Sequence, residues 1–523
     1  MLHHQGWKRC KKGINWLVLV SFVLVVAGCN NRSSVVASEE EEPIFSFENK
    51  DLFKAVSVLS SNRGDTLVGD GQLRKYYASD NTPLWVSPYG VSSAADSLLD
   101  ELSDVEKEGL SRDVFCADTL QKAISRIRRS DFAAGEDTMK IFAEVEYWLT
   151  QSYLRYVAGQ RYGFVNPRRM HNRIDKDKKD AATGRVKSYK MLFDIDIERP
   201  DSVFYATALS KITDSDIKPF ISSVRPQTAL YKELCSLLND TTFDRKALLC
   251  NIERCRWRGY APTGDDNKYV AVNLPAYHLY AHNGDSVLDM KIGCGTFRNK
   301  TPQLVSKISW MEVNPVWIIP KSIIENEVSP HAGDSAYFAR NRYSVIDKAT
   351  GDTVATDSTL TRRMLKSGKY KIVQKGGVGN SLGRIVFRFK NNLSIYLHDT
   401  STKAFFKRER RGVSHGCVRI EKPFDFAAYL LETDDEWLLD KIRISMDIKP
   451  ETDKGKKFMK EHRENNGTDD DLKLVKRRDV EPQVPLHIIY YTVFTDEKGE
   501  MKTYPDIYGY DKILWEHIKP LAK

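Results

Sequence analysis

One cysteine in the C-terminal half of the chain has two histidines close to it in sequence. Cys417 follows His415 by two residues and His398 by 19 residues. A thiol reacts as a nucleophile only as its thiolate, so it needs an imidazole base or a positively charged environment. Three arginines supply such charge and are expected to lower the pKa of the thiol: Arg410, Arg411 and Arg419. These residue types indicate a catalytic cysteine nucleophile, although a metal site or a buried structural cysteine fits the same spacing.

The residues just before Cys417 suggest how a reacting carbonyl group would be held. Gly416 has no Cβ, so the backbone can bend sharply there and approach a substrate. The N–H groups of Gly416 and Cys417 are then expected to face a developing oxyanion. Ser414 is interpreted as a hydrogen-bonding residue of the loop rather than as a nucleophile. The spacing of Cys250 and Cys255 has no zinc-ligand pattern, so no zinc site is predicted there.

Alternating apolar and polar residues predict the strands that position these groups. Residues 268–295 alternate around a turn at Asn283-Gly284, and residues 383–399 form a second hairpin that turns at Asn391-Asn392. His398 therefore ends a predicted strand. Between the hairpins, a polar and mixed insert at about 321–373 is interpreted as a lid. A final strand is predicted at 484–494.

In the N-terminal half, apolar residues recur at the spacing of α-helices instead. Residues 45–225 are predicted to be mainly helical, and residues 227–258 to form a helical connector. The strongest helical stripe consists of Ile141, Val145, Leu149, Tyr153 and Tyr156. A run of charged residues at 449–481 is interpreted as a mobile loop. The predicted fold class is therefore α+β, with a helical domain followed by a β-rich domain.

Length and composition exclude several classes of protein. The 523 residues are enough for two to four domains with sizeable cores. With 41% hydrophobic and 29% charged residues, the chain is neither a polytopic membrane protein nor mostly disordered. The net charge of +9 is small for this length, and no zinc-finger, Walker or RNA-binding motif is present. No nucleic-acid partner is expected.

The first residues have the features of an export signal. A basic segment precedes the apolar stretch Ile14 to Gly28, which is too short for a comfortable membrane span. Val26-Ala27-Gly28-Cys29 resembles the cleavage and lipidation site of bacterial lipoproteins, so Cys29 is the expected lipid attachment point. The chain is thus expected in the bacterial cell envelope, lipid-anchored to a membrane and facing the periplasm. Six further cysteines follow in this disulfide-permissive compartment, and their pairing is left open.

The segment around Cys417 resembles the signature of the L,D-transpeptidases with a YkuD-type catalytic domain. That signature is a histidine, about fifteen residues, and then Ser-His-Gly-Cys; here fifteen residues separate His398 from Ser414. Other segments resemble the long, YcbB-like branch of the family: PLWV (83–86), YGFVNPRRM (162–170), NIERCRW (251–257), VAVNLPAYHLY (270–280), TPQLVSKI (301–308), NPVWIIPKSI (314–323), NSLGRIVFRF (380–389) and PDIYGYD (505–511). The resemblance covers about residues 50–520.

The resemblance implies a domain plan and a fold. The fold is a helical scaffold domain followed by a mixed β-sandwich with helices, into which a lid or capping subdomain is inserted. The expected segments are a signal peptide (1–28), a tether (29–44), the scaffold domain (45–225), a helical connector (226–267), the catalytic domain (268–448, insert about 321–373), a charged loop (449–481), and a C-terminal strand and extension packed on the catalytic domain (482–523).

The resemblance also implies an activity, peptidoglycan L,D-transpeptidation. Cys417 would attack a tetrapeptide stem, release its terminal D-Ala and keep the rest as a thioester, which an amine of a second stem converts into a 3→3 crosslink. His398 would act as general base and acid, and His415 would support the site. Family members are characteristically acylated by carbapenems, and the resemblance implies neither a metal nor a cofactor. The further expected substrate-binding residues are Arg419, Tyr396, Ser414 and Asp399.

Three alternatives stay open at this point. Water in place of the amine would make the protein an L,D-carboxypeptidase, and a protein amine would make it attach wall peptides to proteins. A non-catalytic envelope scaffold is disfavoured because His398 and Cys417 are both present in register. The residues themselves leave open the third stem residue, the oligomeric state and the action of the insert.

Overall fold

The computed structural model describes residues 42–523 apart from 66, 80–81, 180–182, 215–216, 263–266 and 466–471. The predicted signal peptide (1–28), Cys29 and nearly all of the tether (29–44) lie outside the described residues. The chain divides after Pro43, and the unit described here is Ile44–Lys523. Within the described residues, no helix combines the length and the apolar character needed to cross a membrane.

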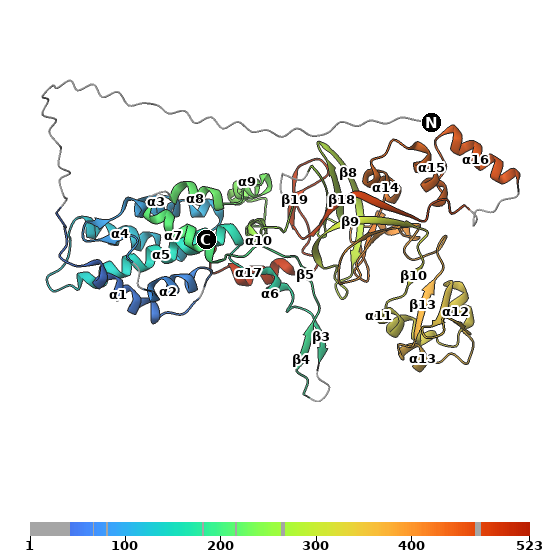
Figure 1. Ribbon diagram of the computed structural model, residues 1–523, viewed down its shortest axis with the longest axis horizontal. Helices are drawn as coiled ribbons and strands as arrows, with labels where there is room; N and C mark the ends of the chain where they lie inside the picture. Colours follow the sequence, from blue (N-terminus) through green and yellow to red (C-terminus); the bar gives the residue numbers. More distant parts are fainter. Residues whose placement is uncertain are drawn as a thin grey trace, which may run out of the picture. The chain divides into compact units, whose positions relative to one another are not determined.

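The N-terminal region is helical and surrounds one hydrophobic core (Figure 1). Its central helix is α5, Thr138–Tyr162, whose predicted stripe is buried at Val145, Leu149, Tyr153 and Tyr156 and half-buried at Ile141. The other elements are α1 Asn49–Ser61, α2 Asp70–Ala78, β1 Val86–Ser87, β2 Gly90–Val91, α3 Ser93–Ser103, η1 Val105–Glu108, η2 Arg112–Phe115, α4 Ala117–Arg128, α7 Ser202–Thr213 and α8 Ile217–Val224. The apolar stripe predicted this arrangement because such a stripe must be buried.

A buried carboxylate fixes the segment Leu84–Val86 on α5. Glu146 is fully buried and accepts hydrogen bonds from the N–H groups of Leu84, Trp85 and Val86, at 2.5, 2.8 and 2.9 Å. The hydroxyl of Tyr77 donates to the same side chain at 2.6 Å. Four donors offset the cost of burying the carboxylate, which would be large without them. This explains why an acidic residue stands within the apolar stripe.

Eight strands of the C-terminal half close into a mixed barrel within the described chain. Their order is β14-β15-β17-β8-β7-β6-β18-β9, and β14 pairs with β9 to complete the ring. They are β6 Lys268–Asn273, β7 His278–Asn283, β8 Ser286–Gly295, β9 Gln303–Val313, β14 Ile385–Phe389, β15 Leu397–His398, β17 Val418–Ile420 and β18 Arg477–Ile489. The α+β class is confirmed, and closure leaves these strands without a free edge.

Shorter elements attach to the barrel. Strand β5, Phe193–Asp194, runs parallel to β9, and β16, Gly412–Ser414, pairs with β8. Beside the barrel lie η6 Lys403–Lys407, α14 Pro423–Leu431, α15 Glu436–Ser445, α16 Asp453–Glu464, β19 Val493–Thr495 and β20 Met501–Thr503. Strand β5 lies in the region expected to be helical, so the chain before the connector already contributes to the sheet.

The connector links the helical region to the barrel through buried charges on helix α10, Arg245–Arg256. Glu253 accepts hydrogen bonds from the N–H groups of Phe164 and Val165, at 2.7 and 2.9 Å. The next residue of the helix, Arg254, forms a 2.5 Å ion pair with Asp511 of the C-terminal segment. Helices α6 Pro167–His171, α9 Ala229–Ser236, η3 Leu237–Asn239 and α17 Tyr510–Ile518 complete this layer. The C-terminal extension therefore packs on the connector as well as on the barrel.

The insert is a small subdomain with its own core. A four-stranded sheet in the order β10-β13-β11-β12 packs against short helices. The elements are β10 Trp317–Ile318, α11 Lys321–Ile323, η4 Ile324–Val328, η5 Ser329–His331, α12 Ser335–Arg340, β11 Tyr343–Asp347, β12 Thr353–Val354, α13 Arg362–Lys366 and β13 Tyr370–Gln374. At its base, the side-chain amide of Asn380 donates to the carbonyl of Pro315 at 3.1 Å, which ties the exit of the insert to its entry.

Three expectations about local structure differ from the observed fold. The charged segment 449–481 contains helix α16, and strand β18 already begins at Arg477. Helix α16 has few buried residues, and its i,i+4 charge pairs stabilise it in solvent. Apolar periodicity therefore does not reveal this helix. The second hairpin pairs Phe387 with Leu397, so its connection is longer than a tight turn at Asn391-Asn392.

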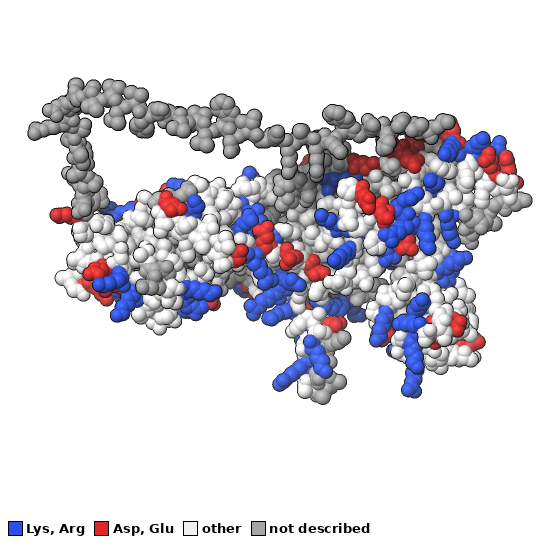
Figure 2. Space-filling model, in the orientation of Figure 1, with Lys and Arg blue, Asp and Glu red and all other residues white. Residues whose placement is uncertain are grey.

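A two-stranded hairpin, β3 Lys176–Lys179 with β4 Val186–Tyr189, was not expected in the helical region. Figure 2 shows lysine and arginine side chains gathered on this hairpin and on the insert. Two contacts join the base of the hairpin to the barrel. Lys190 donates to the carbonyl of Arg298 at 3.0 Å, and Asp175 forms a 2.7 Å ion pair with Lys300.

Candidate active site

Cys417 ends a tight loop just before strand β17, and hydrogen bonds within the loop hold its shape. The hydroxyl of Ser414 donates to the carbonyl of Cys417 at 2.6 Å and accepts from the N–H of Gly416 at 3.1 Å. Gly416 has a φ of +126°, and a Cβ there would stand 3.1 Å from the end of the Ile395 side chain. The loop needs glycine at this position because L side chains rarely adopt such a φ. Ser414 is thus a hydrogen-bonding residue of the loop.

A threonine outside the motif around Cys417 supports the loop from the segment that joins β8 to β9. Thr301 donates through its hydroxyl to the carbonyl of Gly416 at 2.8 Å and accepts from the N–H of Gly295 at 2.8 Å. The N–H of Thr296 also donates to the carbonyl of Ser414 at 3.0 Å. The segment 295–301 therefore fixes the backbone around the nucleophile. Its only sequence signal was its place in the resembling segment 301–308.

The thiol of Cys417 is half-buried and is held in its protonated form. Burial raises its pKa above the ordinary value, while the N–H of Tyr396 and the charges of Arg419 and Arg388 partly offset this effect. The sulfur lies 3.8 Å from the carbonyl oxygen of Ser394, to which the thiol donates. The expectation of a lowered thiol pKa is therefore wrong, because burial outweighs the nearby arginines. The thiol can react as a nucleophile near neutral pH only if a base removes its proton.

His398 is placed to act as that base. Its side chain is buried, and its Nδ1 lies 2.5 Å from the backbone carbonyl oxygen of Asp399. A carbonyl oxygen only accepts, so Nδ1 carries the proton and Nε2 keeps its lone pair. Burial, and then the charge of Arg419, lowers the pKa of His398 to about 4, although the hydrogen bond to Asp399 opposes the shift. The imidazole is therefore neutral near pH 7 and able to accept a proton.

The strand register puts the two groups on one face of the sheet. β15 and β17 run parallel, with Leu397 opposite Val418 and His398 opposite Arg419. Leu397 and Val418 belong to the barrel core, so His398, Arg419 and Cys417 face the other side. In the described part of the chain, no hydrogen bond joins the imidazole to the thiol. Unliganded enzyme sites often lack hydrogen bonds that form only when substrate binds.

Among the arginines, Arg419 and Arg388 contribute charge near the thiol. Within the described residues, no carboxylate forms an ion pair with Arg419, and its guanidinium lies 5.8 Å from the ring centre of Phe405. Arg388 stacks on Tyr396, with its guanidinium 4.3 Å from the ring centre. The predicted residues Arg419 and Tyr396 thus lie at the site, each half-buried.

Two other arginines that were expected to add positive charge have different surroundings. Arg411 is buried and donates to the backbone carbonyls of Ile292, Arg408 and Tyr277, so it stabilises the loop before β16. Arg410 is exposed. Neither residue contributes to the pKa of the thiol, which corrects the expectation that all three arginines would lower it.

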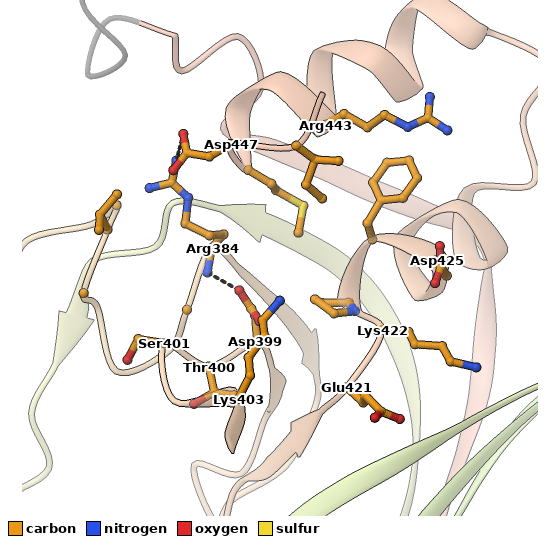
Figure 3. A pocket seen from close by; sticks show the side chains of 18 of the residues that line it. Arg384, Asp399, Thr400, Ser401, Lys403, Glu421, Lys422, Asp425, Arg443 and Asp447 are labelled. Carbon is orange, nitrogen blue, oxygen red and sulfur yellow. Dashed lines mark hydrogen bonds and ion pairs between the residues drawn. The ribbon is translucent and has the colours of Figure 1, made fainter. Parts of the chain in front are cut away.

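Asp399 follows His398 in the chain, and its carboxylate points toward the backbone N–H of Arg384 (Figure 3). The N–H of Arg384 donates to this carboxylate at 2.8 Å, and the Arg384 side chain forms a 2.7 Å ion pair with Asp447. A Cβ on Gly383 would stand 2.5 Å from the backbone carbon of Asp399, so glycine is required there. The backbone carbonyl, rather than the carboxylate, orients His398. These residues line a pocket of about 630 Å³ whose lining does not include Cys417.

His415 lies on the opposite side of the loop and contacts the insert. Its Nε2 lies 2.6 Å from a carboxylate oxygen of Glu327 on η4, and both side chains are about half exposed. Within the described residues, this contact joins the loop before Cys417 directly to the insert. His415 therefore connects the two segments. No sequence pattern indicates Glu327, because the pairing depends on how the insert folds back.

The oxyanion donors are fewer than expected. The N–H of Gly416 donates to Ser414, so it is engaged within the loop. No acceptor among the described residues binds the N–H of Cys417. This single N–H is available to a carbonyl oxygen approaching the sulfur.

Neither a disulfide nor a metal cluster is found in the described part of the chain. Its six cysteines have free thiols: Cys116, Cys235, Cys250, Cys255, Cys294 and Cys417. Among the same residues, no group of three His, Cys, Asp or Glu side chains is arranged to hold a metal ion. Burial raises the pKa of Cys235 to about 11 and of Cys294 to about 12, so these thiols are unreactive near neutral pH.

Comparison with known families agrees with this geometry. Residues 267–444 match the L,D-transpeptidase catalytic domain family, and residues 71–183 match a family described as the scaffold domain. Residues 267–444 form an L,D-transpeptidase catalytic domain. The predicted resemblance is confirmed, and the matched range contains His398, Ser414 and Cys417 together with the insert.

Individual proteins similar to this chain share less than a third of its residues over the aligned segments. The chain is 27% identical over 337 residues to a Haemophilus influenzae protein whose name assigns it provisionally to the L,D-transpeptidases, and it spans 62% of that relative's length. A solved L,D-transpeptidase from Mycobacterium smegmatis is 13% identical, with a TM-score of 0.18, over 31% of this chain and 53% of its own. L,D-transpeptidase 1 of Mycobacterium tuberculosis is 14% identical, with a TM-score of 0.13, over 31% and 55%.

Proposed function

We propose that the protein is a peptidoglycan L,D-transpeptidase that forms 3→3 crosslinks through a thioester on Cys417. The observation that carries this proposal is the pairing of a protonated thiol with a buried, neutral imidazole on one face of an L,D-transpeptidase catalytic domain. Acyl transfer requires a base that is unprotonated near neutral pH, and the lowered pKa of His398 provides one.

The first half-reaction forms the thioester. His398 Nε2 takes the thiol proton while Sγ of Cys417 attacks the carbonyl carbon between the third stem residue and the terminal D-Ala. The N–H of Cys417 donates to the oxyanion of the tetrahedral intermediate. The carbon–nitrogen bond then breaks, the imidazolium gives its proton to the departing amine, and D-Ala leaves. The acyl group stays on sulfur, so its energy is conserved for transfer.

The second half-reaction transfers the acyl group to an amine. His398, neutral again, removes a proton from the side-chain amine of a second stem as that nitrogen attacks the thioester carbon. The carbon–sulfur bond breaks, and the sulfur recovers the proton from the imidazolium. The products are a 3→3 crosslink and the free thiol. Water as the attacking group gives L,D-carboxypeptidase activity by the same steps, and the half exposure of Cys417 supports that second reaction.

Substrate recognition is assigned to the charged groups around the thiol. Stem peptides carry several carboxylates, and Arg419 has no carboxylate partner among the described residues, so it is available to bind one of them. Tyr396, stacked on Arg388, forms the wall of the site next to the thiol. A carbapenem would acylate Cys417 in the same way as the stem. We also propose that Cys29 carries lipid and that the protein is anchored in the bacterial envelope, facing the periplasm.

The test is product analysis with purified protein. Residues 44–523 are incubated with disaccharide tetrapeptide, and the products are separated and identified by mass spectrometry. The proposal expects a 3→3 dimer and free D-Ala with the native chain and neither with the Cys417→Ala variant. The matched control, Cys116→Ala, should keep full activity because Cys116 lies in the helical region. Tripeptide without dimer would identify a carboxypeptidase, and no product from folded protein would contradict both.

A further inference from the structure

An exposed phenylalanine stands beside the nucleophile loop without a structural role in the core. Phe297 is 63% exposed, the highest exposure of an aromatic side chain in the described barrel. It follows Thr296, whose N–H donates to the carbonyl of Ser414 at 3.0 Å. The ring therefore lies next to the segment that holds Cys417. Burying an aromatic ring contributes to stability, so a ring left in solvent at this place indicates a binding role.

One face of this ring already contacts a fixed charge. The ammonium of Lys300 lies 4.4 Å from the centre of the Phe297 ring. Lys300 is buried, and it forms a 2.7 Å ion pair with Asp175. The cation–π contact holds the ring in one orientation and leaves its other side accessible. A rigid aromatic platform loses little conformational entropy when it binds a partner.

The surface continues from Phe297 onto the β3–β4 hairpin. Lys190 donates to the carbonyl of Arg298, and Phe193 pairs with Gln303, so the segment 190–193 runs beside 298–303. Two more large apolar side chains are exposed along it, Tyr189 at 41% and Met191 at 40%. Exposed cations accompany them: Lys176, Arg185, Lys187 and Arg298. Figure 2 shows basic side chains on this hairpin. We call the surface formed by residues 185–191 and 297–298 the hairpin strip.

The chemistry of the hairpin strip fits a saccharide that carries acidic groups. Aromatic rings bind the C–H faces of pyranose sugars, and exposed lysine and arginine side chains attract carboxylates. A purely anionic polymer would need no aromatic platform, and an apolar partner would not favour the surrounding cations. Because the strip starts at the nucleophile loop, its occupant belongs to the substrate whose peptide reaches Cys417.

We propose that the hairpin strip binds the glycan strand of the donor, with a sugar ring on Phe297 and stem carboxylates near Arg298 and the hairpin. This inference rests on the proposed function, since it names the part of peptidoglycan that the same site holds. The strip supplies the glycan contact from the catalytic domain and the hairpin themselves.

The kinetic test compares two donors that differ only in the sugar. Initial rates of D-Ala release are measured for disaccharide tetrapeptide and for the same tetrapeptide without the disaccharide. The native chain should prefer the sugar-bearing donor, and Phe297→Ala should lower kcat/KM for that donor on the order of tenfold, with little change for the bare peptide. The matched control is Tyr89→Ala, an aromatic side chain of the helical region that is 54% exposed, which should keep the preference.

Two results would overturn the assignment of the strip. Equal rates for both donors with the native chain, or an unchanged preference in Phe297→Ala, would show that the sugar is not bound there. If neither donor reacts, the proposed function fails, and the strip is then tested alone by fluorescence anisotropy with labelled glycan strands freed of stems. Binding by the native chain that Phe297→Ala weakens and Arg298→Gln leaves unchanged would support the strip; absence of binding would contradict it.

Discussion

The pH at which Cys417 reacts with an alkylating reagent distinguishes two kinds of cysteine site. Burial raises the pKa of its thiol above the ordinary value of 9.0, and the neutral His398 stabilises no thiolate at rest. At pH 7, two or more units below that pKa, less than about 1% of the thiol is ionised. The rate of alkylation at pH 7 should therefore be at least about 100-fold below its plateau and rise about tenfold per pH unit. A preformed thiolate–imidazolium pair would instead be near its plateau at pH 7.

The assay is timed labelling with iodoacetamide, quantified at Cys417 by peptide mass spectrometry from pH 6 to 10. Two variants test the cause of the profile. In Arg419→Gln the profile should move to higher pH, because a charge that stabilises the thiolate is lost. In His398→Gln labelling below pH 8 should hardly change, although acyl transfer from a stem is lost. Labelling that reaches its plateau by pH 7 in the native chain and collapses in His398→Gln would refute the reasoning.

Three further outcomes are expected. Gly383→Ala should lower the free energy of unfolding by about 2–4 kcal/mol, since positive φ costs about 1 kcal/mol and the overlap with Asp399 on the neighbouring segment adds about 1–3 kcal/mol. Gly368→Ala, with a similar φ but open space, should lose only the first part in urea titrations, and equal losses would contradict the packing argument. Glu327→Gln should change KM for stems by less than about fivefold because the ion pair is half exposed, whereas Glu325→Gln in the same insert should leave kinetics unchanged. His398 has a folded-state pKa of about 4 and an unfolded value near 6.5, so the unfolded chain binds the proton first and stability falls by about 3 kcal/mol as pH falls through that range. His398→Gln should flatten that slope in chemical denaturation, and an unchanged slope would assign it to other groups.

The sequence predicted the class of fold and the placement of His398 and Cys417 on strand ends because each depends on local pattern. His398 and Cys417 stand at a spacing that two neighbouring strands can bring together, and strand alternation placed both. The helical stripe on α5 predicted the N-terminal region for the same reason. Closure of the strands into a barrel could not be predicted from the sequence. The β14–β9 pairing joins segments about 70 residues apart, and it depends on the whole topology.

Features that depend on burial and on long-range contacts were missed. The arginines near Cys417 predicted a lowered thiol pKa. The sequence does not show that the sulfur is half-buried or that the Arg411 side chain donates to backbone carbonyls. The support from Thr301 and the contact of Glu327 with His415 come from distant segments that fold back on the loop. Such contacts leave no periodic signal, so only the assembled chain reveals them.

The most direct test of the account is capture of the acyl group on the enzyme. Protein is mixed with disaccharide tetrapeptide, quenched in acid within the first turnovers and analysed by intact and tandem mass spectrometry. The account predicts a mass increase equal to the donor stem minus D-Ala, located on Cys417, present in the native chain and absent in Cys417→Ala and His398→Ala. Release of D-Ala without any adduct, or an adduct on another residue, would contradict the thioester mechanism.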